Sequence, residues 1–222
     1  MGRSLVADGF QVLAFDNRGS GATTTDSPFT FADMTSDVVA LWDHLGIAQS
    51  HLLGVSMGGE IAQTVATDCA ERVLRLILVS TTADSRWVLR SGNQHWGDDL
   101  PTIQANLEPY FSPSFVKANQ VLIKAMAKNI FDQVRLGFHA NAAAQRQAFD
   151  QFNWVHELGN ITAKTLVIHG DADAILDPSA AVELARLIPD ARLELLPGMG
   201  HLLLAEAPKA LHSLVTNFLS QP

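Results

Sequence analysis

Short runs of apolar residues, each ending at glycine or at polar residues, recur along the chain and predict buried β-strands. The first run covers residues 10–15 (FQVLAF), and others follow at 51–55, 74–80, 166–169 and 193–196. Continuous apolar runs of this length are typical of strands that are covered on both faces. We therefore expect a sheet buried between two layers.

Between these runs, apolar residues recur at the three- and four-residue spacing of amphipathic helices. The clearest helix contains Met34, Val38 and Trp42; it starts at Thr30 or Asp33, and Gly46 supplies its stop. Further helices are expected at about 57–69, 178–188 and 206–219. Strands that alternate with helices predict an α/β fold, with a largely parallel sheet and helices on both faces.

One region, residues 84–158, breaks this alternation because it has helical spacing and no strand pattern. We interpret it as a helical lid inserted between two parts of a core, residues 1–83 and 159–222. An apolar substrate group enclosed by the lid would contact its aromatic residues, although each aromatic taken singly fits better in the core of the lid itself. The candidate substrate contacts are Trp87, Trp96, Phe138, His139 and Trp154.

Composition narrows the class of protein. The chain has 222 residues, 47% of them hydrophobic, which suffices for one sizeable core with or without a small subdomain. The net charge of −8 argues against nucleic acid and anionic membranes as partners. Cys69 is the single cysteine, so no internal disulfide can form. With no apolar stretch of membrane-spanning length and no signal-peptide pattern, we expect a soluble cytoplasmic protein. The sequence makes no prediction of its oligomeric state.

The segment from Gly54 to Gly58 (GVSMG) carries the first candidate chemistry, because it joins a predicted strand to a predicted helix. A serine on such a tight turn, here Ser56, is exposed as a nucleophile, and we expect glycine on both sides because larger side chains would clash. The backbone N–H of Met57 would then lie at a helix N-terminus, where it can stabilise an oxyanion.

A nucleophilic serine needs a base, and His201 is the preferred candidate among 8 histidines. It lies in a glycine-rich loop after a predicted strand, where active-site groups of α/β sheets gather. His169 is expected to pack at the end of its strand, whereas His95 and His139 lie in the lid. Asp16 and Arg18 are expected to form a structural corner.

The base in turn needs a carboxylate to hold its tautomer. Asp171, Asp173 and Asp177 all follow the strand at 166–169; Asp173 is preferred, Asp171 is second and Asp84 is a more distant alternative. The order serine, aspartate, histidine is that of an α/β-hydrolase triad. We expect neither a metal nor a cofactor.

Four motifs together, FDNRGSG, GVSMGGEIAQ, TLVIHGDAD and LPGMGHLLLAEAP, resemble the α/β-hydrolase fold superfamily from Asp16 to the C-terminus. Within it the chain looks most like the branch of 3-oxoadipate enol-lactonase and methylesterases. Non-haem haloperoxidase-like esterases and carbon–carbon bond hydrolases share much of the same motifs. The resemblance implies Ser56 as nucleophile, His201 as base and Asp173, through its Gly-x-x-Asp motif, as the orienting carboxylate. A serine at position 56 argues against the dehalogenase and epoxide-hydrolase branches.

The chain departs from this family at its N-terminal end, where the first strands of the family and its His-Gly loop would precede residue 1. That loop supplies a second oxyanion N–H, whose loss costs about 10²–10³ in rate. We expect the sequence to be incomplete, and the strands at 10–15 and 51–55 either to leave a gap or to pair directly. Two hypotheses remain: a serine hydrolase of a small carboxylic ester or lactone that forms an acyl-enzyme on Ser56, or a non-catalytic remnant or binding module.

Overall fold

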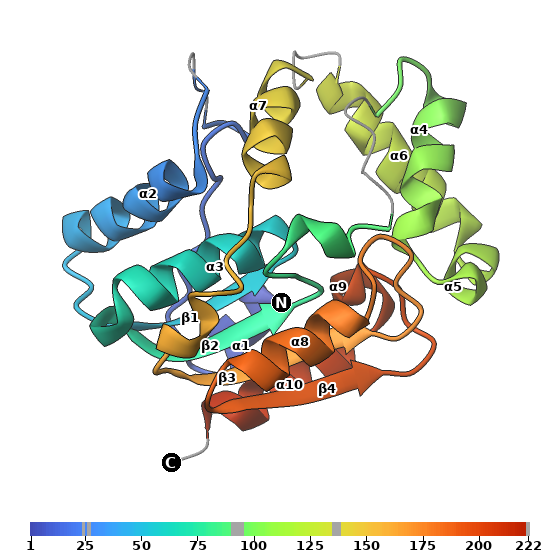
Figure 1. The fold of residues 1–222 in the computed structure, drawn as a ribbon. Coiled ribbons are helices and arrows are strands. Elements are labelled where there is room, and N and C mark those ends of the chain that lie inside the picture. Colours follow the sequence, from blue (N-terminus) through green and yellow to red (C-terminus); the bar gives the residue numbers. More distant parts are fainter. Residues whose placement is uncertain (24, 26–27, 90–95, 135–138, 221–222) are drawn as a thin grey trace.

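The sheet is parallel and its strand order follows the chain. The computed structural model describes residues 1–222 except 24, 26–27, 90–95, 135–138 and 221–222. Within the described residues, 4 strands form one sheet in the order β1-β2-β3-β4, with every pairing parallel. They are β1 (Ser50–Val55), β2 (Val73–Val79), β3 (Lys164–Gly170) and β4 (Ala191–Leu196). These match the predicted strands after residue 50 and confirm the α/β fold (Figure 1).

Helices cover both faces of the sheet because alternate strand residues point in opposite directions. Along β2, Leu76 and Leu78 join a buried cluster on one face, whereas Ile77 and Val79 join a cluster on the other. The first cluster is covered by α2 (Phe31–His44), α3 (Met57–Asp68) and α8 (Ser179–Leu187). The second is covered by α1 (Gly2–Ala7), α9 (Leu203–Glu206) and α10 (Pro208–Leu219).

The start of α2 is fixed by a reciprocal pair of hydrogen bonds that involves both predicted start residues. Thr30 Oγ1 accepts from the N–H of Asp33, and Asp33 Oδ2 accepts from the N–H of Thr30 at 2.8 Å. This capping box satisfies two N–H groups that the helix itself leaves free. Gly46 follows the helix with φ +67°, as a stop residue should.

The predicted strand at residues 10–15 is wrong. This segment has no regular secondary structure, and Val12, Leu13 and Phe15 remain 39–42% exposed. An apolar run becomes a strand only where a neighbouring strand exchanges hydrogen bonds with it. In the described part of the chain β1 pairs with β2 alone, so the first run leaves a gap and does not pair directly with β1.

The predicted last helix, 206–219, is interrupted. The structure divides it into α9 and α10, with Ala207 between them in a non-helical conformation. Pro208 explains the break, because its ring disfavours helical geometry at the preceding residue and is well suited to the first turn of a new helix. The short α9 follows the loop that carries His201 and contacts it through Glu206 and Gly200.

The region that we interpret as a lid contains α-helices and no strand among its described residues, although Asp84 and Val88 form isolated β-bridges. Its helices are α4 (Leu100–Leu107), α5 (Pro113–Ala118), α6 (Gln120–Val134) and α7 (His139–Asp150). Ile103, Leu107 and Ile123 form the centre of a third buried cluster, and α7 packs through Ala148 against the sheet-side cluster of α2 and α3. Single-turn 3₁₀ helices connect the elements: η1 (Ala70–Arg72), η2 (Ser85–Trp87), η3 (Glu108–Tyr110) and η4 (Leu158–Asn160).

Candidate active site

Ser56 lies at the turn between β1 and α3 in a backbone conformation that is uncommon for any residue except glycine. Its φ is 52° and its ψ is −125°. Such a conformation costs of order 1–3 kcal/mol and persists only where the surroundings enforce it. Here the N–H of Ser56 donates to Val79 O at 2.9 Å, and its carbonyl accepts from Thr81 Oγ1 at 2.8 Å. The end of β2 therefore holds the turn from both sides.

The glycines around Ser56 have unequal roles. A Cβ on Gly54 would lie 2.2 Å from Gly58 O, so no side chain fits at that position. The matching expectation for Gly58 is wrong, because a Cβ there meets nothing within 4 Å. The second steric constraint lies one residue later, at Gly59, where a Cβ would be 2.6 Å from the Thr81 side chain. Close packing of α3 on the end of β2 thus selects glycine at 54 and 59.

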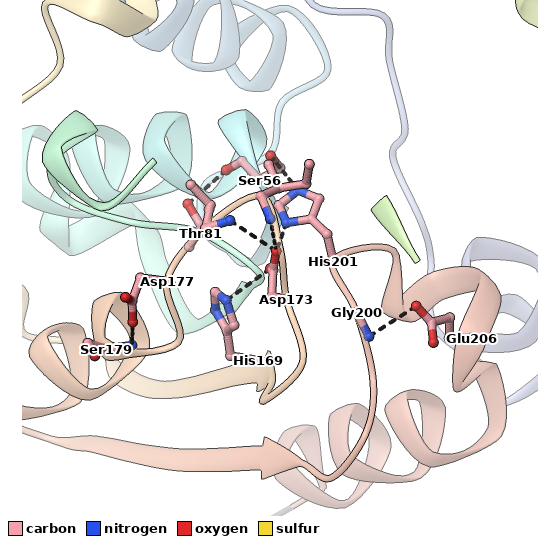
Figure 2. A network of polar contacts seen from close by, with 11 residues as sticks. Ser56, Thr81, His169, Asp173, Asp177, Ser179, Gly200, His201 and Glu206 are labelled. Carbon is pink, nitrogen blue, oxygen red and sulfur yellow. Dashed lines mark hydrogen bonds and ion pairs between the residues drawn. The ribbon is translucent and has the colours of Figure 1, made fainter. Parts of the chain in front are cut away.

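The structure brings Ser56, His201 and Asp173 together in a line (Figure 2). His201 Nε2 lies 3.0 Å from Ser56 Oγ, and His201 Nδ1 lies 2.8 Å from Asp173 Oδ2. The histidine follows β4, the aspartate follows β3 and the serine follows β1, so all three come from the carboxyl ends of parallel strands. With Nδ1 donating to the carboxylate, Nε2 is left to accept the serine proton.

Asp173 is buried and held by four neighbouring groups. Its Oδ1 accepts from the N–H groups of Ile175 at 2.8 Å and Leu176 at 3.0 Å. Its Oδ2 faces His201 and also His169 Nε2, which lies 3.0 Å away without ideal hydrogen-bond geometry. Burial raises the pKa of Asp173, but the contacts with the two histidines outweigh it and hold that pKa well below the usual carboxyl range. The carboxylate is therefore charged at neutral pH.

The three alternative aspartates have other partners. Asp171 Oδ1 accepts from the N–H of Gly198 at 2.6 Å, and Asp177 accepts from the N–H of Ser179 at 2.8 Å at the start of α8. Asp84 accepts from the N–H of Arg86 at 2.8 Å. Each stabilises a loop or a helix start, whereas Asp173 alone among them contacts His201 in the structure.

The N–H of Met57 is placed beside the nucleophile, as the sequence predicts. Met57 is the first residue of α3, and its N–H has no hydrogen-bond partner among the described residues. The positive end of the helix dipole adds to its attraction for a developing negative charge. The turn therefore offers one donor for an oxyanion on the substrate.

The candidate lid contacts separate into different environments. Trp87 Nε1 donates to Glu183 of α8 at 2.7 Å, and Trp154 Nε1 donates to Thr67 of α3 at 3.0 Å. Both indoles are therefore tied to helices of the core. Phe138 and His95 lie outside the described residues, and the side chain of His139, the first residue of α7, is not described either.

Trp96 contacts a second aromatic residue, Tyr110, which lies beside His201. The rings of Trp96 and Tyr110 are 5.6 Å apart, and Tyr110 meets the ring of His201 edge to face at 5.6 Å. Sequence patterns did not single out Tyr110, because an isolated aromatic in a helical region is equally typical of a lid core. Its contact with His201 depends on how the lid folds back over the sheet.

Structural roles are confirmed for the polar corner after residue 15. Arg18 forms a bidentate pair with Asp37 of α2, with both N–O distances at 2.6 Å, and Asp16 Oδ2 accepts from the N–H of Ala22 at 2.9 Å. Among the described residues, no group of three His, Cys, Asp or Glu side chains is arranged to hold a metal ion. No helix in that part of the chain is both long and apolar enough to cross a membrane.

Comparison with known proteins agrees with the α/β fold. A family model described as alpha/beta hydrolase fold matches residues 1–208. A protein of Mycobacterium tuberculosis that carries the name non-heme bromoperoxidase BpoC is 29% identical, over 98% of this chain and 86% of its own. The 3-oxoadipate enol-lactonase 2 of Acinetobacter baylyi is 27% identical, over 94% and 78%. The crystal structure of the enol-lactonase from Burkholderia xenovorans LB400 superposes with a TM-score of 0.80 at 28% identity, over 93% of this chain and 79% of its own.

Proposed function

The chain belongs to the alpha/beta hydrolase fold family, and on that premise we propose that it is a serine hydrolase that cleaves a small carboxylic ester or lactone through an acyl-enzyme on Ser56. The observation that carries the proposal is the continuous hydrogen-bonded line from Ser56 Oγ through His201 to Asp173, with distances of 3.0 and 2.8 Å. Nucleophile, base and orienting carboxylate are each within the reach that this chemistry requires.

The first half of the reaction forms the acyl-enzyme. His201 Nε2 takes the proton of Ser56 as Oγ attacks the substrate carbonyl, and Asp173 stabilises the imidazolium that results. The carbonyl oxygen becomes an oxyanion and accepts a hydrogen bond from the N–H of Met57. The C–O bond to the leaving oxygen then breaks, and His201 returns its proton to that oxygen, which departs as an alcohol or, for a lactone, stays attached to the acyl chain.

The second half releases the acid. Water loses a proton to His201 Nε2 and attacks the acyl carbonyl, and the tetrahedral intermediate expels Ser56 Oγ, which recovers the proton. The carboxylic acid product leaves and the free enzyme is restored. Asp173 is suited to its part throughout, because its low pKa keeps it charged in both halves.

Support for the substrate class comes from the relatives. Two of the similar proteins are named enol-lactonases, and a lactone is an internal ester that the same attack opens. The remaining hypothesis is a non-catalytic hydrolase-fold remnant or binding module. Its motivation is the oxyanion donor: beside Ser56 the described structure presents the N–H of Met57, and we assign that role to no second group.

Hydrolysis of p-nitrophenyl acetate by the wild-type chain and by Ser56→Ala tests the proposal. We expect the substitution to lower kcat by at least about 10³-fold, since loss of the nucleophile removes the acyl-enzyme route. Ser179→Ala, at an exposed helix start, is the matched control and should hydrolyse like the wild type. A fluorophosphonate probe should label the wild type and Ser179→Ala but not Ser56→Ala. Equal turnover by all three chains would contradict the proposal and favour the binding module.

A further inference from the structure

The carboxylate of Glu206 in α9 joins two segments that are far apart in the sequence. Its Oε1 accepts from the N–H of Gly200 at 3.0 Å and from the N–H of Ser112 at 2.8 Å. Its Oε2 accepts from Ser112 Oγ at 2.6 Å. Gly200 precedes His201, and Ser112 caps α5 of the lid. Figure 2 shows the contact between Glu206 and the Gly200 end of this bridge.

The three segments meet at Gly200 without room for a side chain. A Cβ on Gly200 would lie 2.6 Å from Glu206 Oε1 and 2.7 Å from the backbone of both Phe111 and Ser112. This crowding shows that the lid backbone packs directly on the loop of His201. Because Ser112 is only 2% exposed, its bonds to Glu206 are also shielded from water.

A second contact holds the other side of His201. The N–H of Leu202 donates to Tyr110 O at 3.0 Å, and the ring of Tyr110 meets the ring of His201 edge to face at 5.6 Å. The backbone is thus attached to the lid both before and after the base: through Glu206 at Gly200 and through Tyr110 at Leu202. A displacement of the lid would therefore also displace the backbone on both sides of His201.

We propose that Glu206 is a positioning residue that fastens the lid to the loop of His201, so that docking of the lid sets the base in line with Ser56. The inference rests on the proposed function, because it assigns His201 the task of deprotonating Ser56. Reaction rates are sensitive to such placement, since a displacement of about 1 Å can cost 10²-fold. The carboxylate has no contact with the reacting atoms and acts through the two backbones that it joins.

The proposed role of Glu206 depends more on the length of the side chain than on its negative charge, and two conservative variants separate these two properties. Glu206→Gln keeps the length and leaves an amide oxygen to accept from both N–H groups. Glu206→Asp keeps the charge but is shorter by one methylene, about 1.5 Å, and cannot bridge both segments. Glu108→Asp is the matched control, because the Glu108 carboxylate accepts from Gln104 at 3.0 Å and both residues belong to the lid.

The experiment measures p-nitrophenyl acetate hydrolysis and backbone hydrogen exchange of the four chains. We expect Glu206→Asp to lower kcat about ten- to a hundredfold, with faster exchange in peptides that contain the N–H groups of Gly200 and Ser112. Glu206→Gln should stay within about threefold of the wild type, and Glu108→Asp should not change kcat. A Glu206→Asp chain with the kcat of the wild type and with the same slow exchange at Gly200 and Ser112 overturns the inference. So does lost protection with unchanged kcat, or a Glu206→Gln chain as impaired as Glu206→Asp.

Failure of the proposed function has a different signature. In that case Ser56→Ala hydrolyses the ester as fast as the wild type. The kcat of the Glu206 variants then no longer reports on His201 and Ser56, and the positioning role is rejected together with the proposed function. The exchange of the Gly200 and Ser112 amides still decides whether Glu206 joins the lid to this loop. Loss of activity in Ser56→Ala together with normal activity in Glu206→Asp instead retains the function and removes the positioning role.

Discussion

At the scale of single residues, Asp173 is shared between two histidines. His201 Nδ1 and His169 Nε2 lie 2.8 and 3.0 Å from the same carboxylate oxygen, and His169 is fully buried. The sequence places His169 at the end of a strand, where packing is the ordinary role of such a residue. Its contact with Asp173 shows that it also influences the charge that orients His201, because the carboxylate divides its interaction between two rings.

Replacement of His169 by leucine tests this sharing. With His169 gone, one of the two histidine contacts that hold the pKa of Asp173 down is lost, so we expect that pKa to rise. The carboxyl ¹³C signal of labelled aspartate, followed by NMR as pH is lowered, measures the shift. His169→Gln, whose amide can still donate toward Asp173, should raise the pKa less. A pKa of Asp173 that stays in place in His169→Leu, with only stability reduced, would assign His169 to packing alone.

Residues of the site differ in how far the sequence reveals them. Ser56 and His201 could be identified because each lies in a glycine-rich turn directly after a predicted strand. Asp173 follows a third strand together with Asp171 and Asp177, and the Gly-x-x-Asp motif of the family that the chain resembles selects it among them. Glu206 and Tyr110 could not, because their contacts join the lid to the loop of His201, and no local pattern encodes that meeting. The role of Gly58 was misassigned for a similar reason: the steric limit depends on how α3 packs on Thr81.

At the scale of elements, α3 buries a carboxyl group that has no partner. Glu60 is fully buried, and neither of its oxygens has a hydrogen-bond partner in the described structure. Burial raises the pKa of Glu60 well above the ordinary carboxyl range, so the group is held in its neutral form. The unfolded chain, by contrast, ionises this side chain at a pKa of about 4.3.

The sign of the resulting pH dependence follows from proton binding. Between these two pKa values the folded state binds the proton and the unfolded state does not, so the free energy of unfolding falls by about 1.4 kcal/mol per pH unit as pH rises. Glu60→Gln, which cannot ionise, should remove this fall and become more stable relative to the wild type from pH 5 upward. Urea unfolding at several pH values measures it, with exposed Glu71→Gln as the control. Parallel profiles of Glu60→Gln and the wild type would show that Glu60 is solvated.

Strands were predictable wherever a partner strand lies beside them. The runs that became β1, β2, β3 and β4 were recognisable from apolar content alone, and so was the start of α2 from its capping residues. Residues 10–15 have the same apolar content and remain irregular, because pairing depends on a neighbour that the run itself does not encode. The break at Ala207 was visible in principle, since Pro208 disfavours helix at the residue before it.

At the scale of the whole molecule, buried side chains form three clusters. Two lie on opposite faces of the sheet, and the third joins α4, α5 and α6 and contains no strand residue among those described. The third cluster meets the core through Leu202 and Ala205, beside His201. Helical spacing indicated the lid, but its bounds of 84–158 remain a prediction, because α7 packs with the sheet-side cluster and not with the third.

This separation predicts that the lid opens without unfolding the sheet. Ile123 in α6 and Ile168 in β3 are equally buried, at 0% exposure, and truncation of either to alanine should cost about 2–5 kcal/mol at its site. We expect Ile123→Ala to speed hydrogen exchange in α4 and α6 while β2 and β3 stay protected. Ile168→Ala should instead lower the protection of every element, because the sheet is common to both faces. Exchange that rises equally in the lid and the sheet for Ile123→Ala would show that they unfold as one unit, and the lid could then not move independently of the base that it contacts.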